Sequence, residues 1–339
     1  MQLMSPTPWP APPVESEGPA ARMAWYGAVA RWAPSKHNSQ PWHFVASDTS
    51  LEVWSDPTRV LHETDPHRRE MIMSCGAALA TAEVAMRSLG FQPAVTLLPK
   101  GGLALVARLT EQADHDVTEL DRDLLAAVAV RRTDRGPLDG DALPGSEAFL
   151  LQSAAAVAGA TLQLVRSPGD RATLASLVER ADRLLVQRRR VDEEIKNWLR
   201  EPADPRPDGV PTDHSRGAAA SYRAEFVQRD FSSATSSPAQ DRPGSDRPLL
   251  GVLCTTTDRP LDWVRAGQAL AGVLLHTARA GGNASYLNQP VEDPGIRGQL
   301  QEHLCLPGFP QAVLRIGIGG PVDPTPRRAP EDVVERAHR

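Results

Sequence analysis

Apolar residues recur at helical spacing, every three to four positions, in several long segments of the chain. The pattern is most regular over residues 68–89, where Gly90 follows as a typical C-terminal stop. A second strongly apolar segment, residues 263–280, ends at a Gly-Gly pair. The same periodicity predicts further helices over residues 20–32, 117–130, 146–158, 173–200 and 296–304.

Short apolar segments between these helices predict strands. They cover residues 42–46, 51–54, 95–98, 103–109, 161–165, 249–254 and 312–318. Helices and strands do not alternate regularly, so their order favours an α+β fold over a repeated β-α-β arrangement. Each of the two long helices is followed by strand material, which hints at two related halves, although no repeated motif establishes a duplication.

Changes in composition along the chain predict its domain organisation. Residues 1–18 form a Pro-rich tail, and we assign residues 19–125 to an N-terminal half and residues 126–339 to a C-terminal half. Within the second half, residues 201–248 are rich in Pro, Ser, Asp and Arg and have little apolar periodicity. Such a stretch is either a linker or a functional lid, and we expect a lid.

Charge and composition exclude several classes of protein. The chain has 37 basic and 42 acidic residues, and its net charge of −5 argues against nucleic acid as a partner. No apolar segment approaches the ~20 residues that cross a bilayer, and no secretory signal is recognisable, so we expect no membrane partner and a cytoplasmic location. The three cysteines are far apart, which fits neither a disulfide framework nor a metal site, and we expect no metal.

Residues 33–42, Ala-Pro-Ser-Lys-His-Asn-Ser-Gln-Pro-Trp, are the most unusual segment. They place hydroxyl, amide, cationic and aromatic side chains between a predicted helix and a predicted strand. Two prolines restrict the backbone, so the polar groups are pre-set to hold a planar, hydrogen-bonding heterocycle. The alternative is a polar turn between helix and strand, and local chemistry alone favours neither interpretation.

Arginine and hydroxyl side chains form a second candidate site. Arg131, Thr133 and Arg135 share one face if the backbone is extended, and guanidinium groups bind phosphate through paired hydrogen bonds. Arg327 and Arg328 lie between prolines near the C-terminus, from where they can reach back to an anion. The alternatives are a solvated basic linker and a charged tail, because nearly all basic residues of this chain are arginines.

Together these segments resemble the nitroreductase family, whose members bind FMN. Ala-Pro-Ser-x-x-Asn-x-Gln-Pro-Trp is similar to the family's flavin motif, and Arg-Arg-Thr-x-Arg and Arg-Arg-x-Pro are similar to its phosphate-binding motifs. The order of the first two motifs is reversed here, and the chain is much longer than an ordinary member. Both departures fit the Acg-like subfamily, in which one chain mimics a nitroreductase dimer. The resemblance therefore implies a nitroreductase-like fold, a pseudo-dimer of two fused halves, one composite FMN site and a monomer.

The resemblance also implies roles for individual residues. Arginine and threonine side chains would face the FMN phosphate and the pyrimidine edge, the 33–42 segment would line the flavin ring, and Gln289 would lie near flavin N5, although Asn288–Glu292 is also explained as a simple turn. The residues expected to bind FMN are Pro34, Ser35, Lys36, Asn38, Arg131, Thr133, Arg135, Gln289, Arg327 and Arg328.

These expectations predict an FMN-dependent oxidoreductase that passes electrons from NAD(P)H to an unidentified small-molecule acceptor. We name no catalytic acid, base or nucleophile, because the flavin carries the redox chemistry. His37, His43 and His276 are available to deliver a proton. One alternative is a protein that binds or sequesters FMN under a lid without turnover. Another is a biosynthetic flavin dehydrogenase that uses oxygen as the acceptor.

Overall fold

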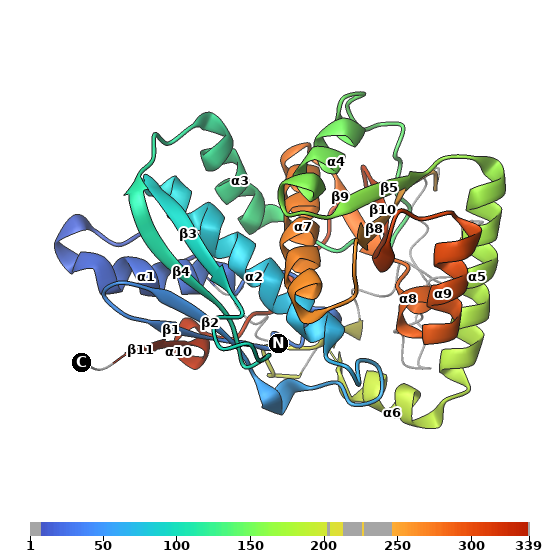
Figure 1. The fold of residues 1–339 in the computed structure, drawn as a ribbon, viewed down its shortest axis with the longest axis horizontal. Helices are drawn as coiled ribbons and strands as arrows, with labels where there is room; N and C mark the ends of the chain where they lie inside the picture. Colours follow the sequence, from blue (N-terminus) through green and yellow to red (C-terminus); the bar gives the residue numbers. More distant parts are fainter. Residues whose placement is uncertain (1–7, 202–203, 213–225, 227–245, 338–339) are drawn as a thin grey trace.

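The computed structural model describes residues 8–201, 204–212, 226 and 246–337. Two sheets and the helices around them make up most of this part of the chain (Figure 1). Most of residues 201–248, the predicted lid, and residues 1–7 of the predicted tail lie outside the described residues. A short parallel pair, β6 (Leu199–Arg200) and β7 (Val210–Pro211), lies at the start of the predicted lid.

The first sheet has five strands and contains both early and late parts of the chain. In spatial order they are β11 (Val334–Arg336), β1 (Trp42–Ala46), β2 (Leu51–Ser55), β4 (Leu105–Asp114) and β3 (Phe91–Leu97). All neighbours are antiparallel except β1 and β11, which run parallel with Phe44 opposite Val334. The C-terminal strand thus completes the sheet of the N-terminal half (Figure 1).

Apolar side chains explain how helices cover this sheet. Strands β1 and β2 alternate buried and half-buried residues, and their buried side chains Phe44 and Val53 belong to one core with α1 and α2. A third helix packs on α7 and α2 rather than on the strands. These helices are α1 (Gly18–Ala30), α2 (Arg69–Ser88) and α3 (Glu119–Val130).

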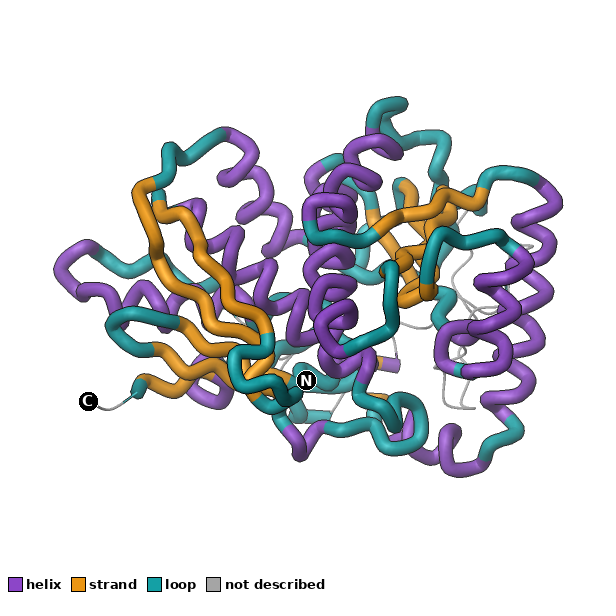
Figure 2. Tube along the Cα trace, viewed as in Figure 1, coloured by secondary structure: helices purple, strands orange, loops and turns teal. Residues whose placement is uncertain are grey.

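The second sheet is antiparallel and is buried on both faces, as its apolar strand sequences require (Figure 2). Its strands, in spatial order, are β5 (Thr161–Val165), β8 (Leu249–Thr255), β10 (Phe309–Gly317) and β9 (Asn283–Tyr286). Helices α4 (Glu147–Val157) and α7 (Pro260–Arg279) cover one face. The other face packs against α5 (Pro168–Val186), α8 (Gln289–Glu292) and α9 (Pro294–His303).

Helices α2 and α7 join the two sheets through a very close crossing. A Cβ atom on Gly76 would press into the carbonyl of Val264, and one on Gly267 would press into the carbonyl of Met73. In each helix the contacted carbonyl precedes the glycine by three residues, so the two contacts are reciprocal. The helices are of equal length, 20 residues each. This reciprocity is the local geometry of a two-fold axis between two similar elements.

The α+β fold class predicted from the sequence is confirmed, while the division at residue 126 stays a prediction. The expected helix over residues 173–200 is instead two helices, α5 and α6 (Arg189–Asn197). They separate at Arg188, whose backbone is extended and whose guanidinium pairs with Asp293 at 2.6 Å. The expected turn at Asn288–Glu292 contains α8, and near the C-terminus the short helix α10 (Pro330–Val333) precedes β11.

Gly267→Ala is expected to lower the free energy of unfolding by about 1–3 kcal/mol, because the added methyl group has no room against α2. Gly272→Ala on the same helix is the matched control. Its Cβ would lie 3.5 Å or more from its neighbours, so the higher helix propensity of alanine should raise stability by up to about 1 kcal/mol. Urea unfolding of both variants measures the difference, and equal stabilities would contradict the close crossing.

Candidate functional site

A cavity opens where the loop after α1, the first half of α2 and the segment after β9 meet. It draws on segments that are far apart in the sequence, from the N-terminal loop to the C-terminal tail. Nine of the ten residues predicted for the site line it: Pro34, Ser35, Lys36, Asn38, Arg131, Thr133, Arg135, Gln289 and Arg327. The tenth, Arg328, does not line the cavity.

The loop between α1 and β1, residues 31–41, forms one wall and has an unusual backbone, so we call it the strained loop. His37, Asn38 and Gln40 all have left-handed φ angles, of 50°, 51° and 48°. Such angles are uncommon for residues other than glycine and cost free energy, so the surrounding contacts must hold them. Part of this support is local, because the backbone N–H of Gln40 donates to the Ser35 hydroxyl over 3.0 Å.

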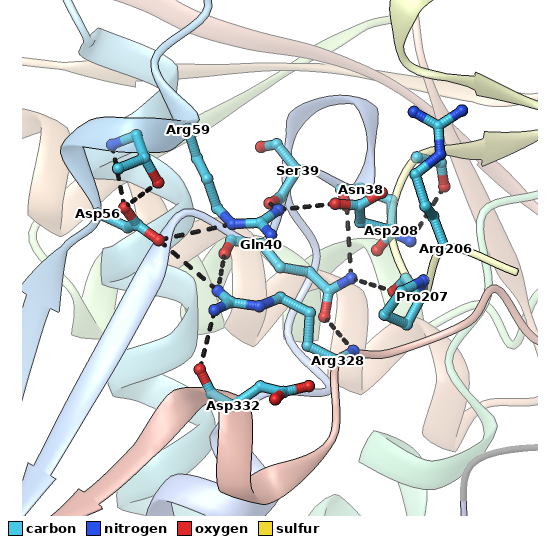
Figure 3. Close-up of polar contacts among 12 residues, drawn as sticks. Asn38, Ser39, Gln40, Asp56, Arg59, Arg206, Pro207, Asp208, Arg328 and Asp332 are labelled. Carbon is cyan, nitrogen blue, oxygen red and sulfur yellow. Dashed lines mark hydrogen bonds and ion pairs between the residues drawn. The ribbon is translucent and has the colours of Figure 1, made fainter.

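Two amide side chains tie this loop to distant segments. Asn38 donates from Nδ2 to the carbonyls of Gly209 (3.0 Å) and Pro326 (3.1 Å), and its Oδ1 accepts from Arg327 (3.1 Å). Gln40 is fully buried, donates to the Pro207 carbonyl at 2.8 Å and accepts from the Arg328 amide at 2.9 Å (Figure 3). The wall is therefore fixed by the N-terminal loop, the residues around 208 and the C-terminal tail together.

Residues 204–212, which we call the strap, lie along this loop. The Asp208 carboxylate anchors it between two guanidinium groups, at 2.8 Å from Arg59 and 2.7 Å from Arg200. Hydrogen bonds from Arg200 and Arg59 lower the pKa of Asp208, although burial opposes them. Val210 of the strap lines the cavity.

Arg328 belongs to this anchoring network rather than to the cavity. Its guanidinium donates to the carbonyls of Gln40 (3.3 Å), Trp42 (3.4 Å) and Asp332 (2.9 Å), and lies 3.8 Å from Asp56 (Figure 3). Its role in the structure is to hold the tail against the start of β1.

Arginine side chains gather on another part of the cavity wall. Arg131 is 7% exposed, and its Nη1 has no hydrogen-bond partner among the described residues. Burial lowers the pKa of Arg131, of Arg132 and, most strongly, of Arg327, and repulsion from the first two lowers the last further. Cations that are buried together in this way are stabilised by an anion.

A short bridge places the arginine segment. Thr133 pairs in parallel with Ala284 of β9, and the amide of Asp134 donates to the Ala284 carbonyl over 3.0 Å. The segment after α3 therefore runs beside the second sheet, where Arg131, Thr133 and Arg135 all reach the cavity. The grouping expected from their spacing is present, and Arg132 also lines the cavity.

Lys36 forms a buried charge cluster at the cavity wall. Its ammonium donates to the Thr64 carbonyl at 2.8 Å and forms ion pairs with Glu70 and, at 3.2 Å, with Glu292. Burial lowers the pKa of Lys36, but Glu292, Glu70 and Asp65 outweigh burial and the net shift is upward. The lysine therefore stays charged.

Asp65 belongs to the same cluster, and its environment disfavours the ionised form of its carboxyl group. It is buried, and its Oδ2 accepts from the amide of Met71 at 2.8 Å near the start of α2. Burial and the neighbouring Glu70 raise its pKa to about 6. Burial and Glu70 therefore disfavour the charged form of Asp65, the third carboxylate of the cluster.

The structure also reveals site residues that the sequence analysis missed. Glu70, Glu292, Asn288 and Tyr286 line the cavity. Tyr286 is half-buried, and desolvation raises its pKa although the nearby Arg131 opposes the shift. Glu70 sits within the predicted helix over residues 68–89, so periodicity assigned it to an ordinary element, and Tyr286 ends the short strand β9, which the sequence pattern did not predict. Among the three candidate histidines, His37 lines the cavity.

Two other kinds of site are absent from the residues that the structure describes. No group of three or more His, Cys, Asp or Glu side chains there is arranged to hold a metal ion. No helix there combines the length and the apolar character that crossing a membrane requires.

The fold and the cavity define an α+β protein with a buried, cation-rich site for an anionic small molecule. No protein-family model matches the chain. Two Mycobacterium tuberculosis proteins are similar to it over most of their length. "Putative NAD(P)H nitroreductase Rv3131" is 33% identical, over 95% of this chain and 96% of that protein. "Putative NAD(P)H nitroreductase acg" is 30% identical, over 89% and 91%. The chain belongs to the nitroreductase family.

A solved structure is also similar, a nitroreductase with bound FMN from Bacteroides fragilis. It is 15% identical, with a TM-score of 0.35, and the match covers 61% of this chain and 95% of that one.

Asp65→Asn is expected to stabilise the protein at pH 7 by up to about 3 kcal/mol, because it removes a carboxylate whose pKa is raised on folding. The folded state of the wild type binds the extra proton, so its stability falls as pH rises from about 4 through 6, and the advantage of the variant grows over the same range. Urea unfolding at pH 4 and pH 7 measures this, with the exposed Asp48→Asn as control. A variant less stable than the wild type at pH 7 would refute the prediction.

Asp208→Ala is expected to loosen the strap, because the buried Arg200 and the half-buried Arg59 lose their shared counter-charge. Amide hydrogen exchange at Gly209 and Val210, which donate to Asn38 and Trp198, should become at least tenfold faster. The matched control is Asp204→Ala in the same strap, whose partner Arg206 is exposed. Unchanged exchange rates in Asp208→Ala would show that the ion pairs do not hold the strap.

Proposed function

We propose that this protein is an FMN-dependent oxidoreductase of the nitroreductase type, which transfers electrons from NAD(P)H through FMN to a small-molecule acceptor. The observation that carries the proposal is the guanidinium of Arg131, which is buried at the cavity wall and has an Nη1 without a partner among the described residues. The names of the relatives, NAD(P)H nitroreductases, supply the kind of chemistry.

The residues of the cavity fit the phosphate end of FMN. Arg131, Arg132, Arg135 and Arg327 bring four cations to the wall, and Thr133 adds a hydroxyl donor. A phosphate monoester is mostly dianionic near neutral pH and accepts several charge-assisted hydrogen bonds. It would relieve the repulsion among these guanidinium groups, which lowers the pKa of Arg327.

Another part of the wall fits a planar ring. Pro34 and Ser35 belong to the strained loop, and Gln289 begins α8, where its Nε2 donates to Asp182 over 3.3 Å. The side-chain NH2 group of Asn38 already donates to two backbone carbonyls. The ammonium of Lys36 is already bound to the Thr64 carbonyl and to the acidic cluster. These two would shape and charge the site more than bind the ring directly. FMN, when bound, supplies hydride transfer at N5.

Contributions from both halves to one cavity support a site that is complete within one chain, so we propose a monomer. The loop after α1 enters the first sheet, whereas Thr133 pairs with the second. In this arrangement no partner subunit is needed to build the wall.

A second function, FMN storage without turnover, is favoured by the strap. Val210 lines the cavity and the strap is fixed to the strained loop by hydrogen bonds through Asn38 and Gln40. A cover held in this way would keep a nicotinamide from reaching the ring.

The visible spectrum under anaerobic conditions decides between these functions. Protein that is yellow and bleaches with NADH or NADPH turns over. Yellow protein that bleaches with dithionite and stays yellow with both nicotinamides stores FMN. Colourless protein that takes up no added FMN would refute both.

Arg131→Met is expected to weaken FMN binding about tenfold or more, because it removes charge-assisted hydrogen bonds worth roughly 1.5–3 kcal/mol. Fluorescence quenching of FMN during titration measures the dissociation constant. Arg108→Met is the control, since Arg108 pairs with Glu52 on the first sheet and does not line the cavity. Equal affinities of the two variants would remove Arg131 from the phosphate site.

A further inference from the structure

We propose that the charge cluster of Lys36, Glu70 and Glu292 sets the reduction potential of the cofactor, with Lys36 acting through its charge rather than as a ligand. This inference rests on the proposed FMN site. The three side chains come from the strained loop, from α2 and from α8, and all three line the cavity.

The hydrogen bonds of Lys36 explain why it would act at a distance. An ammonium group has three protons. Two hydrogen bonds go to the Thr64 carbonyl at 2.8 Å and to the Glu70 carboxylate, and the ammonium also forms an ion pair with Glu292 at 3.2 Å. A ligand would have to compete with these buried interactions to gain a hydrogen bond from Lys36. The ammonium therefore contributes a fixed positive charge to the wall.

Burial makes this charge effective. The side chains of Lys36, Glu70 and Glu292 are 8%, 7% and 4% exposed. Water and salt screen charges at such positions far less than charges on the surface. Glu70 is held further by the Asn288 amide at 3.2 Å and lies 3.8 Å from Arg69, so the cluster is rigidly placed.

The sign of the effect follows from electrostatics. Two electrons and one proton reduce FMN to an anionic form, so reduction adds one negative charge to the site. Loss of the Lys36 charge leaves the carboxylates of Glu70, Glu292 and Asp65 without their counter-charge and should lower the reduction potential. Loss of one carboxylate makes the cluster less negative by one charge and should raise the reduction potential.

The test therefore uses two substitutions of opposite sign, Lys36→Met and Glu292→Gln, in the FMN-loaded full-length protein. Anaerobic titration with dithionite against a reference dye gives the midpoint potential, and titration with FMN gives the affinity of the oxidised form. Each variant should change the ratio of the dissociation constants of oxidised and reduced FMN about tenfold, in opposite directions. For a two-electron couple this is about 30 mV.

Three further variants keep the result unambiguous. Lys36→Arg keeps the positive charge and should restore the wild-type potential, and Glu70→Gln should behave like Glu292→Gln. Lys100→Met is the control for loss of a lysine, because Lys100 lies over the Trp54 ring and does not line the cavity. Its potential should equal that of the wild type.

A purely structural role of the cluster predicts a different pattern. Both substitutions would then weaken binding of oxidised and reduced FMN alike, with no change of potential or with changes of the same sign, and either result would overturn the inference. Wild-type protein that binds no FMN would instead overturn the proposed function on which the inference rests.

Discussion

The backbones of α2 and α7 meet at Gly76 and Gly267, and this contact positions both sheets and the cavity. Met73, whose carbonyl faces Gly267, also lines the cavity, as does Leu270 one turn further along α7. A larger residue at either glycine would push the helices apart and widen the site at the same time. The packing that stabilises the fold and the geometry that holds a ligand are therefore one constraint.

Much of the fold could be predicted because long amphipathic helices and apolar strands carry strong periodic signals. The extents of α2 and α7 follow the pattern closely. Elements whose formation depends on tertiary contacts could not be predicted. Arg188 interrupts a continuous helical pattern where it pairs with Asp293, and β11 is three residues long and is a strand because it pairs with β1.

The site was partly predictable for a related reason. Residues in irregular segments, such as Lys36 and Arg131, stand out because no periodic pattern explains them. Glu70 lies within the regular pattern of α2, and only the packing of the folded chain determines that its side of the helix lines the cavity. Arg327 and Arg328 are adjacent, yet Arg327 lines the cavity whereas Arg328 binds the backbone at the start of β1. Sequence composition does not show which of two neighbouring arginines reaches a cavity.

The pairing of β11 with β1 has a consequence for how the protein is made. During synthesis β1 emerges first, and its partner Val334 emerges nearly three hundred residues later. The edge of β1 therefore stays open until residues 334–336 have been synthesised. The tail before β11 carries Arg327, so a truncated product lacks both the closing strand and a cation of the cavity. The cavity wall and the sheet edge beside β1 are therefore completed by the same late segment of the chain.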